Sequence, residues 1–260
     1  DVDLGDVALI PGLVDAHSHA FQRALRGRTQ HLDGARPEAD FWTWREAMYR
    51  TALALQPGEV EALARLTFLE LVEAGVTAVG EFHYLHHQPD GRPYADPNEL
   101  AHRVIRAARG VGLRIALLRV LYHRGGFQTP ASAAQRRFVD GDVDQALARV
   151  EALGAAWAED PGVAVGLAPH SVRAVPGGWL AAAGAHARQT GRVLHVHACE
   201  QPAELAACRA EHGVEPVALL ERLGVLSPTT TLVHATWLED GAAARIAAAD
   251  ALVCACATTE

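Results

Sequence analysis

Residues 11–19 read Pro-Gly-Leu-Val-Asp-Ala-His-Ser-His, a short apolar run that ends in two histidines one residue apart. Because alternate side chains of a β-strand point to the same face, His17 and His19 share one face of a predicted strand. Two imidazoles in that position can bind one divalent cation, most simply zinc. An isolated His-x-His would favour a simpler interpretation, a pair of hydrogen-bonded surface histidines, so the rest of the chain decides between the two.

Short apolar runs alternate with helical patterns along the whole chain. Most of the runs are almost continuously apolar, which is typical of parallel strands buried on both faces. The predicted strands are Ala8–Ala16, Val76–Phe82, Arg114–Leu121, Val163–Ala168, Arg192–Ala198, Thr231–Ala235 and Ala251–Cys256. The predicted helices are Phe41–Leu55, 57–75, one that begins near 96–99, Val143–Ala158, Trp179–Thr190, Pro216–Leu223 and Asp240–Ala249. This repetition of strand and helix predicts a parallel α/β fold.

The strand count leaves two architectures open. Seven strands are compatible with a doubly wound sheet, whereas a (β/α)₈ barrel needs eight. No Gly-x-Gly-x-x-Gly or Walker motif follows any of the predicted strands, which weakens the nucleotide-binding alternative. One long irregular stretch, residues 27–40, lies between the first strand and the first helix, and loops of that length in compact domains are usually functional.

The composition excludes several classes of protein. Hydrophobic residues make up 50% of the 260 positions, and the net charge of −8 argues against a nucleic-acid partner. All 23 basic residues are arginine, which excludes Schiff-base chemistry on a lysine and a P-loop ATPase. No run of about 18 apolar residues occurs, so no membrane span is expected. Four cysteines without a Cys-x-x-Cys pair, and no secretory cue, predict a cytoplasmic protein with reduced thiols.

A second histidine cluster ends the strand at 192–198. His197 and Glu200 form a His-x-x-Glu pattern, which can place a carboxylate within proton-transfer range of a metal-bound group. His195 lies deeper in the same strand, and we expect it to be a core residue rather than a ligand. A solvent-exposed acid at a helix start is the alternative interpretation of Glu200.

Three more predicted strands carry ionisable groups at their carboxyl ends. His234 ends one strand, His170 and Arg173 follow another, and residues 81–87 follow the second strand with Glu-Phe-His-Tyr-Leu-His-His. The carboxyl ends of barrel strands meet at one rim, where enzymes of that fold keep their chemistry. The sequence therefore predicts that these groups converge on one site, and scattered core histidines are the alternative.

These motifs together resemble the amidohydrolase superfamily and, within it, the formimidoylglutamate deiminases. The resemblance rests on the first His-x-His motif, the later His-x-His-x-x-Glu and the strand-end His234. Its most family-specific stretch is Phe-Trp-Thr-Trp-Arg-Glu-Ala-Met-Tyr-Arg at 41–50. Further matches in order and spacing are 12–27, 81–84, 168–173 and 258–260.

The resemblance implies a TIM-like (β/α)₈ metal-dependent hydrolase barrel. Strands 1 to 7 of that barrel would lie in residues 11–260, and residues 1–10 would be the last part of a small N-terminal β domain. The superfamily's fourth metal ligand, an aspartate at the end of the eighth strand, would lie beyond residue 260. A truncated barrel would leave edge strands unpaired, so a further alternative is that such a piece does not fold stably alone.

The resemblance also implies a role for each matching residue. His17, His19 and His197 correspond to ligands of one Zn²⁺, with another divalent metal as an alternative. His234 corresponds to the catalytic histidine, and Glu200 corresponds to the acid that moves a proton to the substrate nitrogen. The substrate-binding set corresponds to Gln22, Arg45, Tyr84, His170 and Arg173. The expected partners are a small dicarboxylate substrate and a second copy of the chain in a homodimer.

The residue types suit the reaction that the resemblance implies, hydrolysis of N-formimidoyl-L-glutamate to N-formyl-L-glutamate and ammonia. Zinc lowers the pKa of bound water to about 7, and a carboxylate such as Glu200 can protonate the leaving nitrogen. Because the protein is acidic overall, local cations must attract the two substrate carboxylates, and Arg45 and Arg173 offer bidentate guanidinium groups. The alternatives are an aminohydrolase or chlorohydrolase of a heterocycle, and a non-catalytic metal-binding protein.

Two positions depart from the family pattern. Ala257 stands where proline is more common, and we expect only a small effect on the loop. Arg119 lies in the third predicted strand, where the family usually has an apolar residue or proline. A buried arginine needs an ionic partner, and the sequence does not identify that partner.

Overall fold

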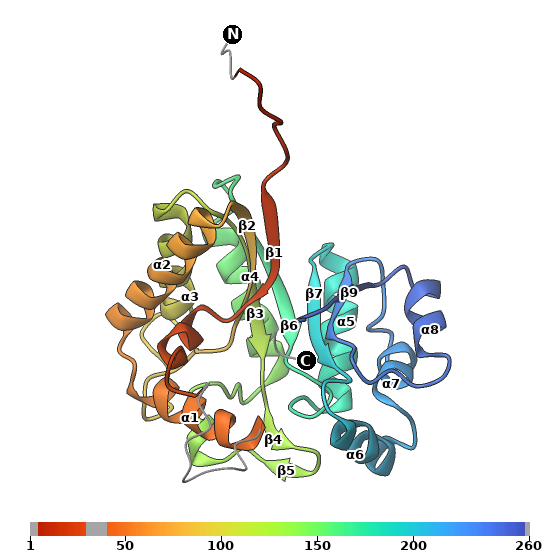
Figure 1. The fold of residues 1–260 in the computed structure, drawn as a ribbon. Helices are drawn as coiled ribbons and strands as arrows, with labels where there is room; N and C mark the ends of the chain where they lie inside the picture. The colour runs from red at the N-terminus through yellow and green to blue at the C-terminus, as the bar shows by residue number, and fades with distance from the viewer. Residues whose placement is uncertain (1–4, 30–40, 258–260) are drawn as a thin grey trace.

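The computed structural model describes residues 5–29 and 41–257, which form a nearly closed barrel of parallel strands surrounded by helices (Figure 1). Its strands are β1 (Leu13–Ser18), β2 (Val76–His83), β3 (Arg114–Leu121), β6 (Val163–Pro169), β7 (Leu194–Ala198), β8 (Thr230–His234) and β9 (Leu252–Cys254). The strands follow one another in the sheet in chain order, and every neighbouring pair is parallel. The predicted α/β fold and its seven strands are therefore confirmed.

The sheet curls so that its two ends approach each other. Four strands separate β1 from β8 in the sheet order, yet the rings of His17 and His234 lie 6.3 Å apart between centroids. The carboxyl ends of β1 and β8, which carry these histidines, therefore face the same barrel interior. This arrangement is that of a TIM-like barrel rather than an open, doubly wound sheet.

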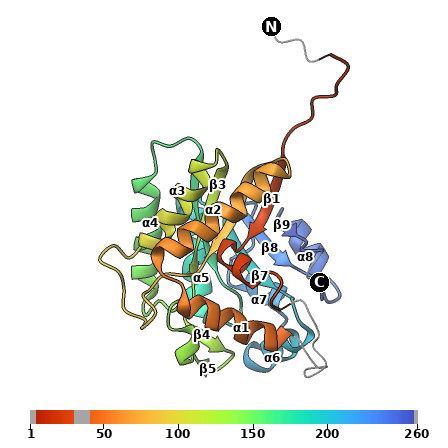
Figure 2. The same ribbon diagram turned by 60° about the vertical axis from the view of Figure 1, so that its left-hand side comes forward.

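Helices surround the barrel, as Figures 1 and 2 show from two sides. They are α1 (Phe41–Ala54), α2 (Pro57–Glu73), α3 (Glu99–Gly110), α4 (Val143–Ala156), α5 (Gly177–Thr190), α6 (Pro202–His212), α7 (Pro216–Arg222) and α8 (Ala242–Ala248). Proline occupies the first turn of α2, α6 and α7, where its missing N–H costs no helical hydrogen bond. Among the described residues, no helix is both long and apolar enough to cross a bilayer.

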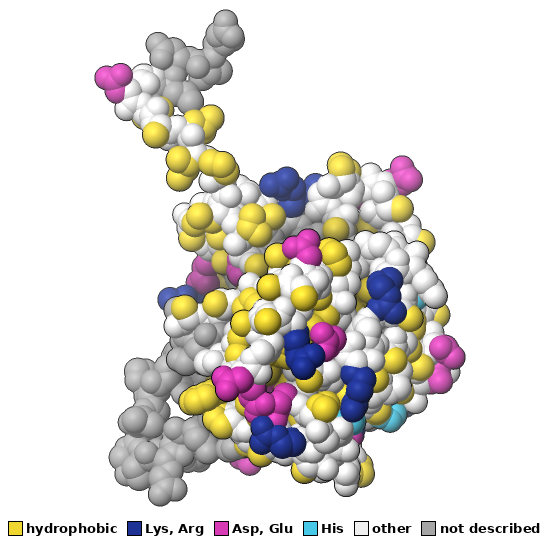
Figure 3. All heavy atoms as spheres, turned by 90° about the vertical axis from the view of Figure 1, so that its right-hand side faces the viewer, with side chains coloured by type: hydrophobic (Ala, Val, Ile, Leu, Met, Phe, Trp, Pro, Cys, Tyr) yellow, Lys and Arg dark blue, Asp and Glu magenta, His cyan; other side chains and the backbone are white. Residues whose placement is uncertain are grey.

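Shorter elements lie at the carboxyl end of the barrel. They are the 3₁₀ helices η1 (Ala20–Leu25) and η2 (Ala133–Gln135) and the two-stranded sheet of β4 (Arg124–Gly126) and β5 (Thr129–Pro130). On the face of the molecule drawn in Figure 3, arginine side chains lie among acidic and apolar ones. That face therefore carries no broad basic patch.

The partner of Arg119 is Asp140. The Arg119 side chain is fully buried, and its Nη1 and Nη2 lie 3.0 and 3.2 Å from the two carboxylate oxygens of Asp140. Its Nε donates to Asn98 Oδ1 at 3.1 Å, and Arg149 binds the same Asp140 carboxylate at 2.6 Å. A strand position that is usually apolar thus holds a paired charge, which satisfies the requirement for burying an arginine.

Several boundaries differ from the sequence predictions. The first strand begins at Leu13, where pairing with Val76 starts, and not at Ala8; Leu9 and Ile10 are largely exposed. Helix α6 and the β4–β5 hairpin were not predicted. Helix α6 begins at a proline that follows Gln201, a pattern that could have revealed it. Most of the stretch predicted to be irregular (residues 30–40 of 27–40) and the family match at 258–260 lie outside the residues that the structure describes.

Candidate metal centre and active site

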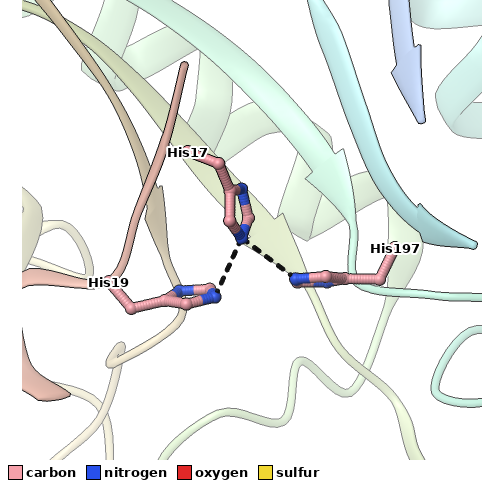
Figure 4. Close-up of side chains that lie close together, drawn as sticks. All are labelled: His17, His19 and His197. Carbon is pink, nitrogen blue, oxygen red and sulfur yellow. Dashed lines mark hydrogen bonds between the residues drawn. The ribbon is translucent and has the colours of Figure 1, made fainter. Parts of the chain in front are cut away.

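Three histidine side chains converge at the carboxyl end of the barrel (Figure 4). His17 lies in β1, His19 directly follows that strand, and His197 lies in β7. His17 Nε2 is 3.1 Å from His19 Nε2 and 3.2 Å from His197 Nε2. Nitrogens that bind one tetrahedral Zn²⁺ at about 2.0–2.1 Å lie roughly 3.4 Å apart, so this spacing fits a single small cation.

Backbone carbonyls fix the tautomers of two of these histidines. His19 Nδ1 lies 3.0 Å from the carbonyl oxygen of Phe82, and His197 Nδ1 lies 3.0 Å from that of His170. A carbonyl can only accept, so each Nδ1 donates and each Nε2 presents its lone pair to the cluster. Burial lowers the pKa of His19 to about 4 and also lowers the pKa values of His17 and His197. The three rings are therefore neutral at pH 7, the state in which imidazole binds a metal.

Two unusual backbone turns place Glu200 and His234 beside this cluster. Cys199, which follows β7, has φ +57°, and His234 and Ala235 have φ +73° and +53°. These residues lack the freedom of glycine, and such conformations persist only where the surroundings hold them. Hydrogen bonds join the two turns, since Ala235 N donates to Ala198 O at 3.0 Å and Trp237 N donates to Cys199 O at 2.9 Å.

The candidate catalytic pair is close to the cluster. The rings of His234 and His197 are stacked with centroids 5.3 Å apart. His234 Nε2 lies 3.9 Å from Glu200 Oε1. A carboxylate and an imidazole therefore stand together at the edge of the three converging nitrogens, where they can exchange protons with a bound molecule.

One cavity of about 1360 Å³ adjoins all of these groups. Every residue that the sequence placed in the site lines it: His17, His19, Gln22, Arg45, Tyr84, His170, Arg173, His197, Glu200 and His234. The structure thus brings the predicted set together from five strand ends and two helical segments. The individual roles of these residues stay predictions.

The predicted substrate-binding residues are held by hydrogen bonds and ring contacts. Gln22 Nε2 donates to Tyr84 Oη at 2.7 Å. The His170 ring packs edge-on against Tyr122 and Tyr84, with centroids 4.8 and 5.8 Å apart. The Arg45 guanidinium lies 5.7 Å from the centroid of the Tyr49 ring. The cavity wall is therefore aromatic, with cations and amides at defined points.

Arg173 lies between two carboxylates, one of which the sequence did not single out. Its Nη2 is 2.5 Å from Glu200 Oε2, and its Nε is 3.4 Å from Glu204 Oε2. Glu204 is buried, and its other oxygen accepts from Cys199 N at 3.0 Å. Burial alone would lower the pKa of Arg173, but the two carboxylates raise it. Glu204 thus supports both the arginine and the turn that carries Glu200. It lies in the first turn of α6, four residues after Glu200, and this closeness to the His-x-x-Glu motif is a signal that could have found it.

The sequence model of a protein family, described as 'Amidohydrolase family', matches residues 8–260. The chain belongs to the amidohydrolase family. The formimidoylglutamate deiminase of Pseudomonas aeruginosa is 41% identical over 254 residues, which cover 97% of this chain and 55% of that protein. A 5-methylthioadenosine/S-adenosylhomocysteine deaminase of Nitratidesulfovibrio vulgaris is 29% identical over 240 residues, covering 92% and 47%. This amidohydrolase chain therefore spans about half the length of the curated relatives it matches.

Solved structures resemble the amidohydrolase barrel described above. An amidohydrolase from Brucella melitensis matches with a TM-score of 0.89 and 36% identity, covering 96% of this chain and 55% of that one. An adenosine deaminase from Xanthomonas campestris with bound zinc matches with a TM-score of 0.73 and 24% identity, covering 95% and 49%. The second likeness shows the fold alone.

Not all of the histidines gather in this amidohydrolase site. From residues 81–87, Tyr84 lines the cavity, whereas His83, His86 and His87 are buried away from it. His86 Nε2 and His87 Nε2 lie 2.8 and 2.9 Å from backbone carbonyl oxygens. The expected convergence of this segment is thus wrong for its histidines, because strand alternation turns Phe82 and Tyr84 inward and His83 outward. His195 is half-buried and lies outside the three-histidine cluster.

Proposed function

We propose that the protein to which this chain belongs is a zinc-dependent hydrolase that converts N-formimidoyl-L-glutamate and water into N-formyl-L-glutamate and ammonia. The observation that carries the proposal is one cavity with three converging histidine nitrogens and, beside them, two arginines, Arg45 and Arg173. The identity to a protein named formimidoylglutamate deiminase supports the choice of substrate. Bound zinc in a solved structure of the same fold supports the choice of metal.

The reaction replaces the carbon–nitrogen bond of a formimidoyl group with a carbon–oxygen bond. His17, His19 and His197 would hold the ion, which when bound would supply Lewis acidity and lower the pKa of a water molecule. In this proposal, Glu200 would give a proton to the nitrogen that leaves as ammonia. His234, 3.9 Å from Glu200, would orient the attacking oxygen and stabilise the charge that develops on it.

Recognition of a dicarboxylate needs local positive charge, because the chain has a net charge of −8. Arg45 and Arg173 both line the cavity and can each form paired hydrogen bonds with a carboxylate. Gln22 and Tyr84, which are hydrogen-bonded to each other, add neutral polar groups to the same wall. A neutral heterocycle would have no use for two guanidinium groups.

A purine nucleoside is the second candidate substrate. The cavity of about 1360 Å³ is large and partly aromatic, and one matching relative is named as a deaminase of 5-methylthioadenosine. The two arginines favour the dicarboxylate over this candidate.

The test compares the two substrates on the full-length protein. Ammonia release is measured with N-formimidoyl-L-glutamate and with 5-methylthioadenosine at matched concentrations in metal-replete buffer. We expect kcat/KM for N-formimidoyl-L-glutamate to exceed that for the nucleoside by about 100-fold or more. Only the dicarboxylate can form charge-assisted hydrogen bonds with both Arg45 and Arg173. Preference for the nucleoside would overturn the proposal in favour of the second candidate.

A further inference from the structure

A pair of tyrosine hydroxyls lies on the cavity wall, backed by a buried glutamine. Tyr49 from α1 and Tyr122, which directly follows β3, both line the cavity and are nearly buried. Gln135, the last residue of η2, lies behind them and is 3% exposed. Tyr49 lies in the family-specific stretch at 41–50, but none of the three was among the predicted site residues.

Hydrogen bonds fix the orientation of the Gln135 amide. Its Oε1 accepts from the backbone N–H of Ser132 at 2.9 Å, so its Nε2 must face the tyrosines. Nε2 donates to Tyr122 Oη at 2.7 Å and to Tyr49 Oη at 3.2 Å. Both N–H groups of the amide are thereby used, and each phenolic oxygen is an acceptor toward Gln135.

This arrangement leaves a hydroxyl proton for the cavity. A phenolic oxygen that accepts from Gln135 must point its own proton elsewhere. The two hydroxyls can satisfy each other with one proton only, so the second proton remains available on the side of the pair that lines the cavity. Burial, followed by the neighbouring Tyr49 hydroxyl, raises the pKa of Tyr122. Tyr122 therefore keeps its hydroxyl proton at neutral pH.

The surroundings of the pair are suited to an anion. The Arg45 guanidinium stands 5.7 Å from the centre of the Tyr49 ring, and Arg45 lines the same cavity. On the other side, the Tyr122 ring lies 4.8 Å from the ring of His170. An oriented donor and a cation on one cavity wall form a combination that recognises a carboxylate, which offers two acceptor oxygens.

We propose that Tyr49 and Tyr122, oriented by Gln135, donate a hydrogen bond to one carboxylate of the substrate on the Arg45 side of the cavity, and so determine specificity for a dicarboxylate. This inference rests on the proposed function, because it assigns residues to the recognition of that substrate. The tyrosines contact the ligand, and Gln135 is a positioning residue.

The experiment measures binding of N-formyl-L-glutamate to the metal-loaded, full-length protein by titration calorimetry. The variants are Tyr49→Phe, Tyr122→Phe and Gln135→Glu, and Tyr94→Phe is the control, because Tyr94 does not line the cavity. We expect one or both of the two cavity tyrosine variants to bind about 10- to 100-fold more weakly, and the control to bind within about twofold of wild type. Gln135→Glu should weaken binding similarly, because its carboxylate would draw the hydroxyl protons away from the cavity.

Two ligand analogues separate recognition from a merely structural effect. N-Formyl-4-aminobutyrate lacks one carboxylate of the ligand, and N-formyl-2-aminobutyrate lacks the other. If the hydroxyl pair binds a carboxylate, the loss caused by the tyrosine variants disappears with one analogue and persists with the other. Equal losses with both analogues, or cavity tyrosine variants that bind like wild type, would overturn the inference.

The outcomes also separate this inference from the proposed function. Wild-type protein that releases ammonia from N-formimidoyl-L-glutamate, combined with variants that bind normally, would keep the function and remove the tyrosine assignment. Protein that binds N-formyl-L-glutamate in the expected pattern, but releases no ammonia from N-formimidoyl-L-glutamate, would keep the tyrosine assignment and remove the proposed function. Wild-type protein that binds no dicarboxylate would contradict both.

Discussion

Arg173 Nη2 lies 2.5 Å from Glu200 Oε2, so the predicted substrate-binding arginine is also the ionic partner of the predicted proton carrier. Glu204 completes the arrangement from the other side of the guanidinium. A substrate carboxylate that binds Arg173 must therefore share it with two resident carboxylates. This relationship distinguishes Arg173 from Arg45 and gives the two arginines different expected phenotypes.

Replacement of the arginines should separate binding from chemistry. Arg45→Met should lower kcat/KM for N-formimidoyl-L-glutamate by about 100-fold, mainly through KM, because it removes a carboxylate contact. Arg173→Met should lower kcat/KM by at least as much and should also lower kcat, because Glu200 loses its partner. Steady-state kinetics measures both, with the exposed Arg65→Met as the control. Unchanged kinetics in both variants would remove the dicarboxylate assignment.

Glu204 should contribute to stability through its contact with the Cys199 turn. Glu204→Leu leaves a buried backbone N–H without an acceptor, which costs about 1–3 kcal/mol of unfolding free energy. Glu204→Gln keeps an oxygen that can accept from Cys199, so its loss should be smaller. Urea denaturation of the two variants checks the order. Equal losses would show that the hydrogen bond to Cys199 does not hold the turn.

Arg119 and Arg149 bind the same carboxylate of Asp140 but differ in burial. Arg119 is fully buried, whereas the Arg149 side chain is 21% exposed. Breaking a buried pair from one side costs about 3–5 kcal/mol, so Arg119→Met should be strongly destabilising and Arg149→Met should cost clearly less. Thermal and denaturant unfolding of the two variants measures the difference. A larger loss for Arg149→Met would contradict the role given to the Arg119–Asp140 pair.

The ion-paired carboxylate of Glu151 should make the free energy of unfolding fall at acidic pH. Hydrogen bonds from Arg192 and then His186 lower the pKa of Glu151 to about 2, against an ordinary value near 4.5. A depressed carboxyl pKa contributes stability that is present above the ordinary value and is lost as the pH falls toward 2. The difference in unfolding free energy between wild type and Glu151→Gln should therefore shrink between pH 6 and pH 3. A difference that stays constant over that range would show that the pair does not act on stability.

The sequence could predict the parts of the site that lie at strand ends. His17, His19 and His197 follow from strand alternation and from the position of each residue at the end of an apolar run. Position at a strand end was not enough for His83, because alternation turns its side chain outward while its neighbours point inward. A shift of one residue along this strand would exchange the side chains that face the cavity with those that face away from it.

Other features depend on contacts that no local pattern records. Asp140 pairs with Arg119 across 21 positions, and Gln135 meets Tyr49 across 86. The left-handed turn at Cys199 occurs in a residue with no intrinsic preference for it, and the surrounding hydrogen bonds hold it. The sequence shows which strand ends carry candidate site residues. Tertiary packing determines which other side chains hold those residues in place.

Hydrolysis should depend on a metal ion held by three histidine nitrogens. Ammonia release from N-formimidoyl-L-glutamate by the full-length protein, measured after chelation and during stepwise return of Zn²⁺, tests this dependence. We predict that chelation abolishes ammonia release and that activity returns in proportion to bound zinc, reaching its maximum at one ion per cluster of His17, His19 and His197. Full activity in the metal-free protein, or no ammonia from the zinc-loaded protein, would contradict zinc-dependent hydrolysis of this substrate.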